Sequence, residues 1–317
     1  MFDLFPSFWT PILPAAEIEN TPVAIELAGE RLVLFRQPSG DIGALVDRCP
    51  HRSAALSLGR VRENGCLECP YHGWQFDRDG ACTQIPLNNP AQLKLSQLSA
   101  TSLPTQIIAG LVWIFTGQGE APKLQLPESL MQSQDSYFIY HEVWNAHWTR
   151  LVENFMDYVH LPFVHRDSFG GAIGQPAIEA GRFVEFQIIK TEHSIQVFNR
   201  FDHPLDSGFA LEWHQPNLVV LKFDQMGTPA PVRMHAFAIP INQHQTRYLI
   251  AMQLLEPYAA EIAHEFIEPV VEDRVVIESQ EGAIPLTTRE CNVPTDQATL
   301  LFRRWYYQML NCQTAAV

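Results

Sequence analysis

Short apolar runs separated by turn residues occupy the first third of the chain. Between residues 20 and 117, runs such as RLVLFRQ, IGALVD and LVWIFTG alternate with turn sequences such as PSGD and RDG. Several short strands at close spacing predict a small antiparallel β domain over residues 1–117. The polar sequence that follows contains two prolines, and it predicts a linker over residues 118–129.

The rest of the chain mixes helical and strand-like patterns. The sequence WTRLVENFMDYVHLPFVH, residues 148–165, has apolar residues at helical spacing, whereas residues 182–256 return to strand-like runs. Residues 257–282 again predict a helix, either interrupted at Pro269 or begun afresh there. For residues 130–317 we therefore expect an α+β domain in which helices flank an antiparallel sheet.

Composition supports a globular protein and excludes some partners. The 317 residues are 46% hydrophobic and 18% charged, which is typical of a chain that buries a substantial core. The 35 acidic residues outnumber the 21 basic ones and give a net charge of −14, so nucleic acid and anionic membrane surfaces would be repelled.

The sequence also predicts a location. Apolar runs such as GLVWIF and YLIAMQLL are far shorter than the roughly 20 residues that span a bilayer, and the N-terminus lacks a basic region before an apolar stretch. We therefore expect neither a membrane anchor nor a signal peptide. The six cysteines are too sparse for a disulfide framework, which favours a reducing, cytoplasmic setting where clustered Cys and His indicate metal.

Four residues in two tight pairs are the strongest chemical signal. Cys49 and His51 are two apart, Cys69 and His72 are three apart, and seventeen residues lie between the pairs. A Cys₂His₂ zinc site is chemically reasonable, but a zinc finger pairs Cys with Cys and His with His along the chain. The mixed pairs suit a two-iron cluster in which each loop gives one Cys to one iron and one His to the other. The residues alone leave a zinc site, an electron relay and an oxidising enzyme open.

The sequences CPH and CPYHGW at this spacing resemble the Rieske [2Fe–2S] motif. The resemblance implies that Cys49 and Cys69 bind the outer iron, whereas His51 and His72 bind the other. Cys66 would be a free thiol beside the cluster. Without a further pair of disulfide cysteines, the motif resembles those of oxygenases and soluble ferredoxins, and an oxygenase needs a second metal site.

The sequence ENFMDYVHLPFVH, residues 153–165, offers such a site. Asn154, Asp157 and His160 recur at steps of three and would form one slanting row on a helix. His165 lies five residues beyond His160, but a helix break near Pro162 could bring the two imidazoles together. Two His and one carboxylate make the facial triad that binds non-haem Fe(II). The sequence leaves the carboxylate open among four acidic residues, Glu268, Glu272, Asp273 and Glu278.

A resemblance to the Rieske non-haem iron oxygenases favours one of these four acidic residues. VVEDRVVIESQ resembles the oxygenase helix in which Asp273 would complete the triad, with Glu272 as the next candidate. The resemblance also implies that Asp157 bridges two subunits for electron transfer, accepting hydrogen bonds from His160 and from His72 of a neighbouring chain. Asn154 would lie just outside the ligands.

The resemblance extends from about Trp9 to the sequence FRRWYYQML. It implies a Rieske domain fused to a helix-grip-like (START-like) catalytic domain, a homotrimer, and a ferredoxin or flavin reductase as electron donor, so that NAD(P)H serves only indirectly. The motifs resemble the homotrimeric branch that includes chlorophyll-pathway (pheophorbide and chlorophyllide a) oxygenases and saxitoxin-tailoring hydroxylases.

From this branch we expect a monooxygenase that uses O₂ to hydroxylate a C–H bond of a small organic molecule. Oxidative O- or N-demethylation and arene dioxygenation are alternatives within the family. A Rieske electron carrier is the alternative from another class, but it would need only the first third of the chain.

Overall fold

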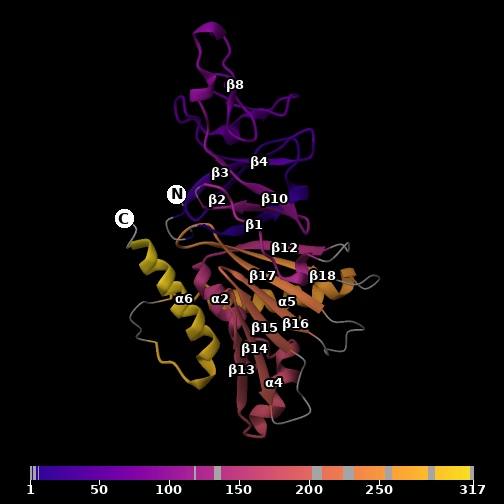
Figure 1. The fold of residues 1–317 in the computed structure, drawn as a ribbon. Coiled ribbons are helices and arrows are strands. Elements are labelled where there is room, and N and C mark those ends of the chain that lie inside the picture. The colour runs from indigo at the N-terminus through magenta and orange to yellow at the C-terminus, as the bar shows by residue number, and fades with distance from the viewer. Residues whose placement is uncertain are drawn as a thin grey trace. The chain divides into compact units, whose positions relative to one another are not determined.

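The computed structural model describes residues 2, 5, 7–117, 119–131, 137–201, 209–223, 232–253, 259–284 and 290–314. The chain divides into two compact units, Met1–Leu126 and Pro127–Val317. Figure 1 shows small sheets in the first unit, and one large sheet with helices in the second. The predicted α+β class is therefore confirmed.

The described residues of the first unit form three antiparallel sheets. The first sheet has the order β1 (Trp9–Pro14), β11 (Leu111–Phe115), β10 (Thr105–Ile108). The second has the order β2 (Val23–Leu27), β3 (Glu30–Arg36), β4 (Ile42–Val46), β9 (Ser102–Leu103). The third has the order β5 (Arg60–Val61), β6 (Leu67–Glu68), β7 (Gln75–Phe76), β8 (Cys82–Gln84).

A single apolar core connects the second and third sheets. Val33 and Phe35 on β3 pack in one cluster with Leu67 and Phe76 of the third sheet. All four side chains are fully buried. The same cluster includes Cys49 and Cys69, so the core fixes the loops that carry these residues.

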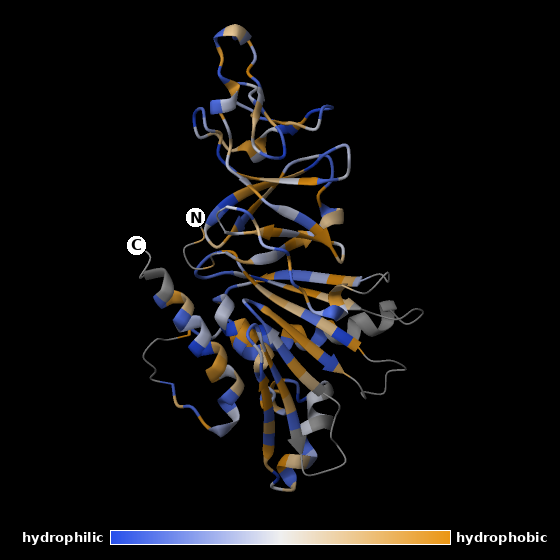
Figure 2. Ribbon diagram, in the orientation of Figure 1, coloured by the Kyte–Doolittle hydropathy of each residue, from blue (hydrophilic) through white to orange (hydrophobic). Residues whose placement is uncertain are grey.

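One seven-stranded antiparallel sheet dominates the second unit. Its order is β12 (Tyr137–Trp144), β18 (Thr246–Gln253), β17 (Val232–Pro240), β16 (Leu218–Phe223), β15 (Phe209–His214), β14 (Ser194–Phe201), β13 (Val184–Lys190). Figure 2 shows that apolar residues concentrate on these strands. The helices are α1 (Glu128–Met131), α2 (Trp148–Met156), α3 (Leu161–Val164), α4 (Phe169–Glu179), α5 (Ala259–Ile277) and α6 (Gln297–Thr314).

Aromatic side chains attach two of these helices to the sheet. Trp213 of β15 contacts Phe302 of α6, with ring centroids 5.5 Å apart, and Tyr248 of β18 contacts Phe155 of α2 at 4.9 Å. The cross-strand register connects Trp213 through Val219 and Ala236 to Ile250, two residues from Tyr248. Because side chains alternate between faces, α2 and α6 cover the same face of the sheet.

Two helix predictions need correction. The row predicted for Asn154, Asp157 and His160 is not helical throughout, because α2 ends at Met156 and Asp157 is extended with ψ 135°. The break therefore begins before Pro162, which instead lies inside the one-turn helix α3. Of the helix predicted at residues 257–282, α5 covers Ala259–Ile277 and runs through Pro269 without a new start, whereas residues 257 and 258 lie outside the described residues. In the described part of the chain, no helix is long and apolar enough to cross a bilayer.

Candidate metal sites

Two similar turns carry the Cys/His pairs of the first unit. The Ser53 N–H donates to the carbonyl of Cys49 at 2.9 Å, and the Gly73 N–H donates to the carbonyl of Cys69 at 3.1 Å. Gly73 has φ +70°, a conformation that glycine adopts without strain. Both turns extend from strands of the buried core, which places the four predicted cluster residues on two adjacent loops.

The side chains of these loops face one another. The rings of His51 and His72 lie edge to face with centroids 4.7 Å apart, and Trp74 stacks on His51 at 4.6 Å. Cys49 and Cys69 are each 2% exposed. Burial, together with the neighbouring Cys69 thiol, raises the pKa of Cys49 to about 11. The Cys49 thiol is therefore protonated at neutral pH unless a metal binds it.

The donor set fits a Rieske cluster. His51 Nδ1 is buried and has no hydrogen-bond partner among the described residues. A buried imidazole nitrogen without a partner is costly, and coordination to iron would satisfy it. Cys66 is also buried but lies outside this set, because its Sγ accepts from Thr83 Oγ1 at 3.4 Å.

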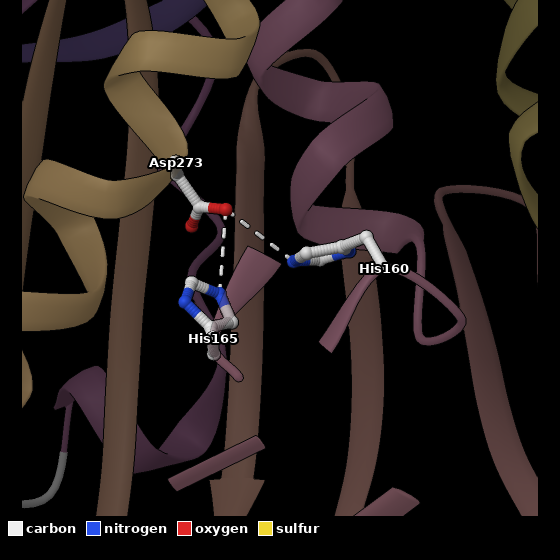
Figure 3. Close-up of side chains that lie close together, drawn as sticks. All are labelled: His160, His165 and Asp273. Atoms are coloured by element: carbon white, nitrogen blue, oxygen red, sulfur yellow. Dashed lines mark ion pairs between the residues drawn. The ribbon is translucent and has the colours of Figure 1, made fainter. Parts of the chain in front are cut away.

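In the second unit, His160, His165 and Asp273 meet. Figure 3 shows Nε2 of both histidines directed at the carboxylate of Asp273 on α5. Asp273 Oδ1 lies 3.5 Å from His160 Nε2 and 3.3 Å from His165 Nε2. One ligand atom from each residue lies within 4.8 Å of the others, which is close enough for one metal ion to bind all three. Two imidazoles and one carboxylate form a donor set suited to Fe(II).

The one-turn helix α3 brings the two histidines together. The Val159 N–H donates to Asp157 Oδ1 at 2.7 Å and stabilises a tight turn after α2. His160 directly precedes α3, and His165 directly follows its last residue. Pro162 fits the first turn of α3 because N–H groups there have no acceptor within the helix. The N–H group that proline lacks therefore costs no hydrogen bond.

The four carboxylates left open by the sequence lie in different surroundings. Glu272 faces the other ring nitrogen of His165, with 2.7 Å between Oε2 and Nδ1. Glu278 accepts from the backbone N–H of Asn145 and pairs with Arg274, whereas Glu268 is exposed. Of the four, Asp273 is the one whose carboxylate faces Nε2 of both histidines.

Asn154 and Asp157 flank this group. Asn154 Nδ2 donates to Asp273 Oδ1 at 3.1 Å and holds that carboxylate in place. Asp157 Oδ2 lies 3.9 Å from His160 Nδ1, too far for a hydrogen bond. Burial raises the pKa of Asp157 and lowers the pKa of His160. Desolvation also acts against protonated His165, but Asp273 and then Glu272 outweigh it and raise the pKa of His165.

A polar cavity of about 520 Å³ borders Asn154, Asp157 and His160. Its lining contains five carboxylate and two guanidinium side chains: Glu153, Asp157, Glu281, Glu290, Asp296, Arg150 and Arg303. Both arginines form ion pairs with Glu153 and Glu290. Three carboxylates of the lining, those of Asp157, Glu281 and Asp296, lie outside these ion pairs. This ion-pair group was not predicted from the sequence, because paired members such as Glu153 and Arg303 lie 150 residues apart.

Comparisons with known protein families match both parts of the chain. The model of the Rieske [2Fe–2S] domain matches residues 8–104, and that of the vanillate O-demethylase oxygenase C-terminal domain matches residues 144–311. The second match alone covers more than half of the chain.

Similar sequences include proteins of several activities. The chain is 34% identical to the 3-chlorobenzoate-3,4-dioxygenase oxygenase subunit of Comamonas testosteroni over 52% of this chain and 39% of that protein. It is 31% identical to chlorophyllide a oxygenase of Chlamydomonas reinhardtii over 78% of this chain and 36% of that protein. The chain thus spans well under half the length of these two relatives. Methylxanthine N1-demethylase NdmA of Pseudomonas putida is 28% identical over 95% of this chain and 88% of its own.

Solved structures share the fold. NdmA of Pseudomonas putida CBB5 aligns with a TM-score of 0.80 and 24% identity, covering 98% of this chain and 92% of its own. Dicamba monooxygenase bound to dicamba aligns with a TM-score of 0.74 and 22% identity, covering 98% of both chains. At these identities the likeness establishes the architecture.

Proposed function

We propose that this chain, which belongs to the Rieske non-haem iron oxygenase family, hydroxylates a C–H bond of a small organic molecule with O₂ and electrons from a ferredoxin or reductase. The observation that carries the proposal is the convergence of His160, His165 and Asp273 in a unit separate from the Rieske domain. An electron carrier would need no such site. The family relation supports an oxidoreductase, and oxygenases of this family take their electrons from a reductase or ferredoxin.

Two groups of residues would hold the metals. Cys49, Cys69, His51 and His72 would bind the [2Fe–2S] cluster, and His160, His165 and Asp273 would bind mononuclear Fe(II). When bound, the cluster supplies electrons and the iron supplies oxygen activation. The protein holds both imidazoles with Nε2 toward Asp273 Oδ1, and Asn154 donates a hydrogen bond to the same oxygen. Orientation of this kind limits the movement of the ligands when substrate binds.

Asp157 is proposed as the link between two copies of the chain. Its carboxylate lies 3.9 Å from His160 Nδ1, a nitrogen without a hydrogen-bond partner in the described part of the chain. A small movement of Asp157 would let one oxygen accept from His160 while the other accepts from His72 of the next subunit. A cyclic homotrimer would allow every subunit to make this contact.

The distribution of charged residues supports an assembly of several copies of the chain. From Arg48 to Arg62 the sequence has four arginines and no acidic residue, although the chain as a whole carries −14. Arg60 and Arg62 pair with Glu68, whereas Arg48 and Arg52 are exposed beside Cys49 and His51. The cavity beside Asp157 has an excess of carboxylates. A basic loop of one copy is therefore complementary to the acidic cavity of another.

Oxidative demethylation is a second candidate that shares the first step. Hydroxylation converts C–H, O₂, two electrons and two protons into C–OH and water. If the carbon is a methyl group on oxygen or nitrogen, the product then loses formaldehyde. The similarity to NdmA, which extends over 95% of this chain, favours an N- or O-methylated substrate.

Substrate-dependent oxygen consumption tests the proposal. The holoprotein, reduced by a ferredoxin and its reductase, is offered methoxylated and N-methylated aromatic compounds together with unmethylated analogues. We expect one class of compound to accelerate O₂ uptake and to yield a product heavier by one oxygen or lacking one CH₂. A protein that contains both metals, reduces its cluster and shows no substrate-dependent uptake with any class would contradict an oxygenase.

A further inference from the structure

Beyond the metal ligands themselves, we propose that Glu272 is a positioning residue for His165. Together with Ser168 it fixes the imidazole so that Nε2 stays directed at Asp273 and the metal. This inference rests on the proposed iron site, but it concerns a residue that the sequence offered only as a substitute ligand.

The contacts around Nδ1 are short. Glu272 Oε2 lies 2.7 Å from His165 Nδ1, and the same oxygen accepts from Ser168 Oγ at 2.8 Å. Because Oε2 already accepts from the Ser168 hydroxyl, Nδ1 of His165 is the donor in its contact with this oxygen. Nε2 is the ring nitrogen on the side of Asp273, as Figure 3 shows, and it is the nitrogen that can bind a metal held by that carboxylate. Glu272 therefore selects both the tautomer and the orientation of the ring.

The backbone of His165 is held as firmly as its ring. Its carbonyl accepts from the N–H groups of Ser168, Gly170 and Gly171 at 3.2, 3.0 and 3.2 Å. The side chain is only 2% exposed. Because the peptide group and Nδ1 are both fixed, the ring has little freedom to turn away from the metal.

Among the residues that the structure describes, none supports His160 in this way. Its Nδ1 is 3.9 Å from Asp157 and lacks a hydrogen-bond partner among the described residues, and its side chain is 15% exposed. The two histidines are therefore unequal. His165 is the anchored ligand, whereas the orientation of His160 depends on a looser contact. Removal of Glu272 should weaken metal binding more than removal of Asp157.

Metal retention in the full-length holoprotein tests this role. Iron loss to a ferrous chelator is followed in E272A, E272Q, S168A and D157A, and the nitric oxide adduct of the bound Fe(II) is examined by electron paramagnetic resonance. We expect iron affinity to fall about 10- to 100-fold in E272A. E272Q, which keeps an acceptor, should recover part of the loss, and S168A should show a smaller effect.

Glu268 provides a matched control because it is an exposed carboxylate on the same helix. E268Q should retain iron as the wild type does, and cluster absorbance should be unchanged in every variant. E272A that retains iron as tightly as E268Q would overturn the inference. Complete loss of the site in both E272A and E272Q, equal to that in D273A, would instead make Glu272 a ligand and would also overturn it.

The iron content of the wild-type protein distinguishes a failure of this inference from a failure of the proposed function. A folded chain that contains the cluster but never binds a mononuclear iron would contradict the oxygenase itself. A chain that binds one such iron, with E272A unaffected, would contradict only the role of Glu272.

Discussion

A few neighbouring residues bring the rings of His160 and His165 to the same site. An uninterrupted helix would turn by about 500° over five residues and would direct the two rings to different sides. Here the Asp157 turn and the single turn of α3 place both rings toward Asp273, with centroids 5.3 Å apart. Because each ring enters the site from a different end of α3, the histidines can be tested one at a time.

Replacing His160 with alanine should remove the mononuclear iron and leave the cluster in place. The cluster residues belong to the other unit of the chain. We expect H160A to lose about one iron per chain and all substrate oxidation, while its visible spectrum and its bleaching by dithionite stay normal. Metal analysis and absorbance check this result. Persistent turnover in H160A would show that the proposed triad is wrong.

Asp157 should matter for electron delivery more than for metal content. In D157N the side chain keeps its size but loses its charge, so it can no longer serve as an ionic acceptor for two imidazoles. We expect both metals to be retained and steady-state turnover to fall about 10- to 100-fold. Iron analysis and oxygen uptake measure the two quantities. Normal coupled activity in D157N would remove Asp157 from the proposed electron route.

At the scale of elements, the packing of α4 on α3 positions His165. A Cβ at Gly170 would lie 2.0 Å from the carbonyl oxygen of Leu161, and one at Gly174 would lie 2.3 Å from the Cβ of Pro162. These glycines let the two helices approach closely. Helix α4 was not predicted from the sequence, because its apolar residues and glycines lack the regular period that marks an amphipathic helix.

Substituting Gly170 with alanine should therefore disturb the metal site indirectly. The backbone atoms that a methyl group would meet cannot move without shifting α3, so we expect a loss of about 1–3 kcal/mol in the free energy of unfolding and weaker iron binding. Denaturant titration and iron retention test both effects. G181A is a useful comparison, since Gly181 has open space around its Cβ position, although its positive φ also adds strain. Equal behaviour of the two variants would argue against a packing role for Gly170.

Charge is distributed unevenly over the whole molecule. The net charge of −14 coexists with a basic sequence around the first cluster loop and an acidic cavity in the second unit. Exposed charges that face one another influence the rate and specificity of association and are screened by salt. The proposed homotrimer should therefore depend on ionic strength.

Opposite substitutions on the two surfaces test that assembly. R52E and E281R should each weaken association at least about tenfold, because like charges placed together at an interface cost several kcal/mol. The double variant R52E/E281R should recover most of the loss. Sedimentation at low and high salt measures the effect, and K94E, an exposed charge reversal in the same unit as Arg52, should behave as the wild type does. If neither single variant changes assembly and R52E slows only reduction by the external donor, the basic loop binds that donor instead.

The order of residues along the chain was enough to predict the two-unit architecture and most of the proposed metal ligands. The alternating Cys and His pairs indicated a Rieske domain, and the apolar periodicities predicted a β unit followed by a helix-flanked sheet, because strand period and turn chemistry are local properties. The pairing of His160 with His165 could also be predicted, because Pro162 and the five-residue spacing of the two histidines are visible in the sequence.

Tertiary structure decided the rest. Four carboxylates followed the histidines at a distance of more than 100 residues, and the sequence could not place them, because the position of α5 against α3 depends on packing between distant segments. In the fold, Asp273 faces both Nε2 atoms, whereas its neighbour Glu272 lies behind His165. The end of α2 before Asp157 and the ion pairs of Arg150 and Arg303 likewise follow from contacts that no local pattern contains.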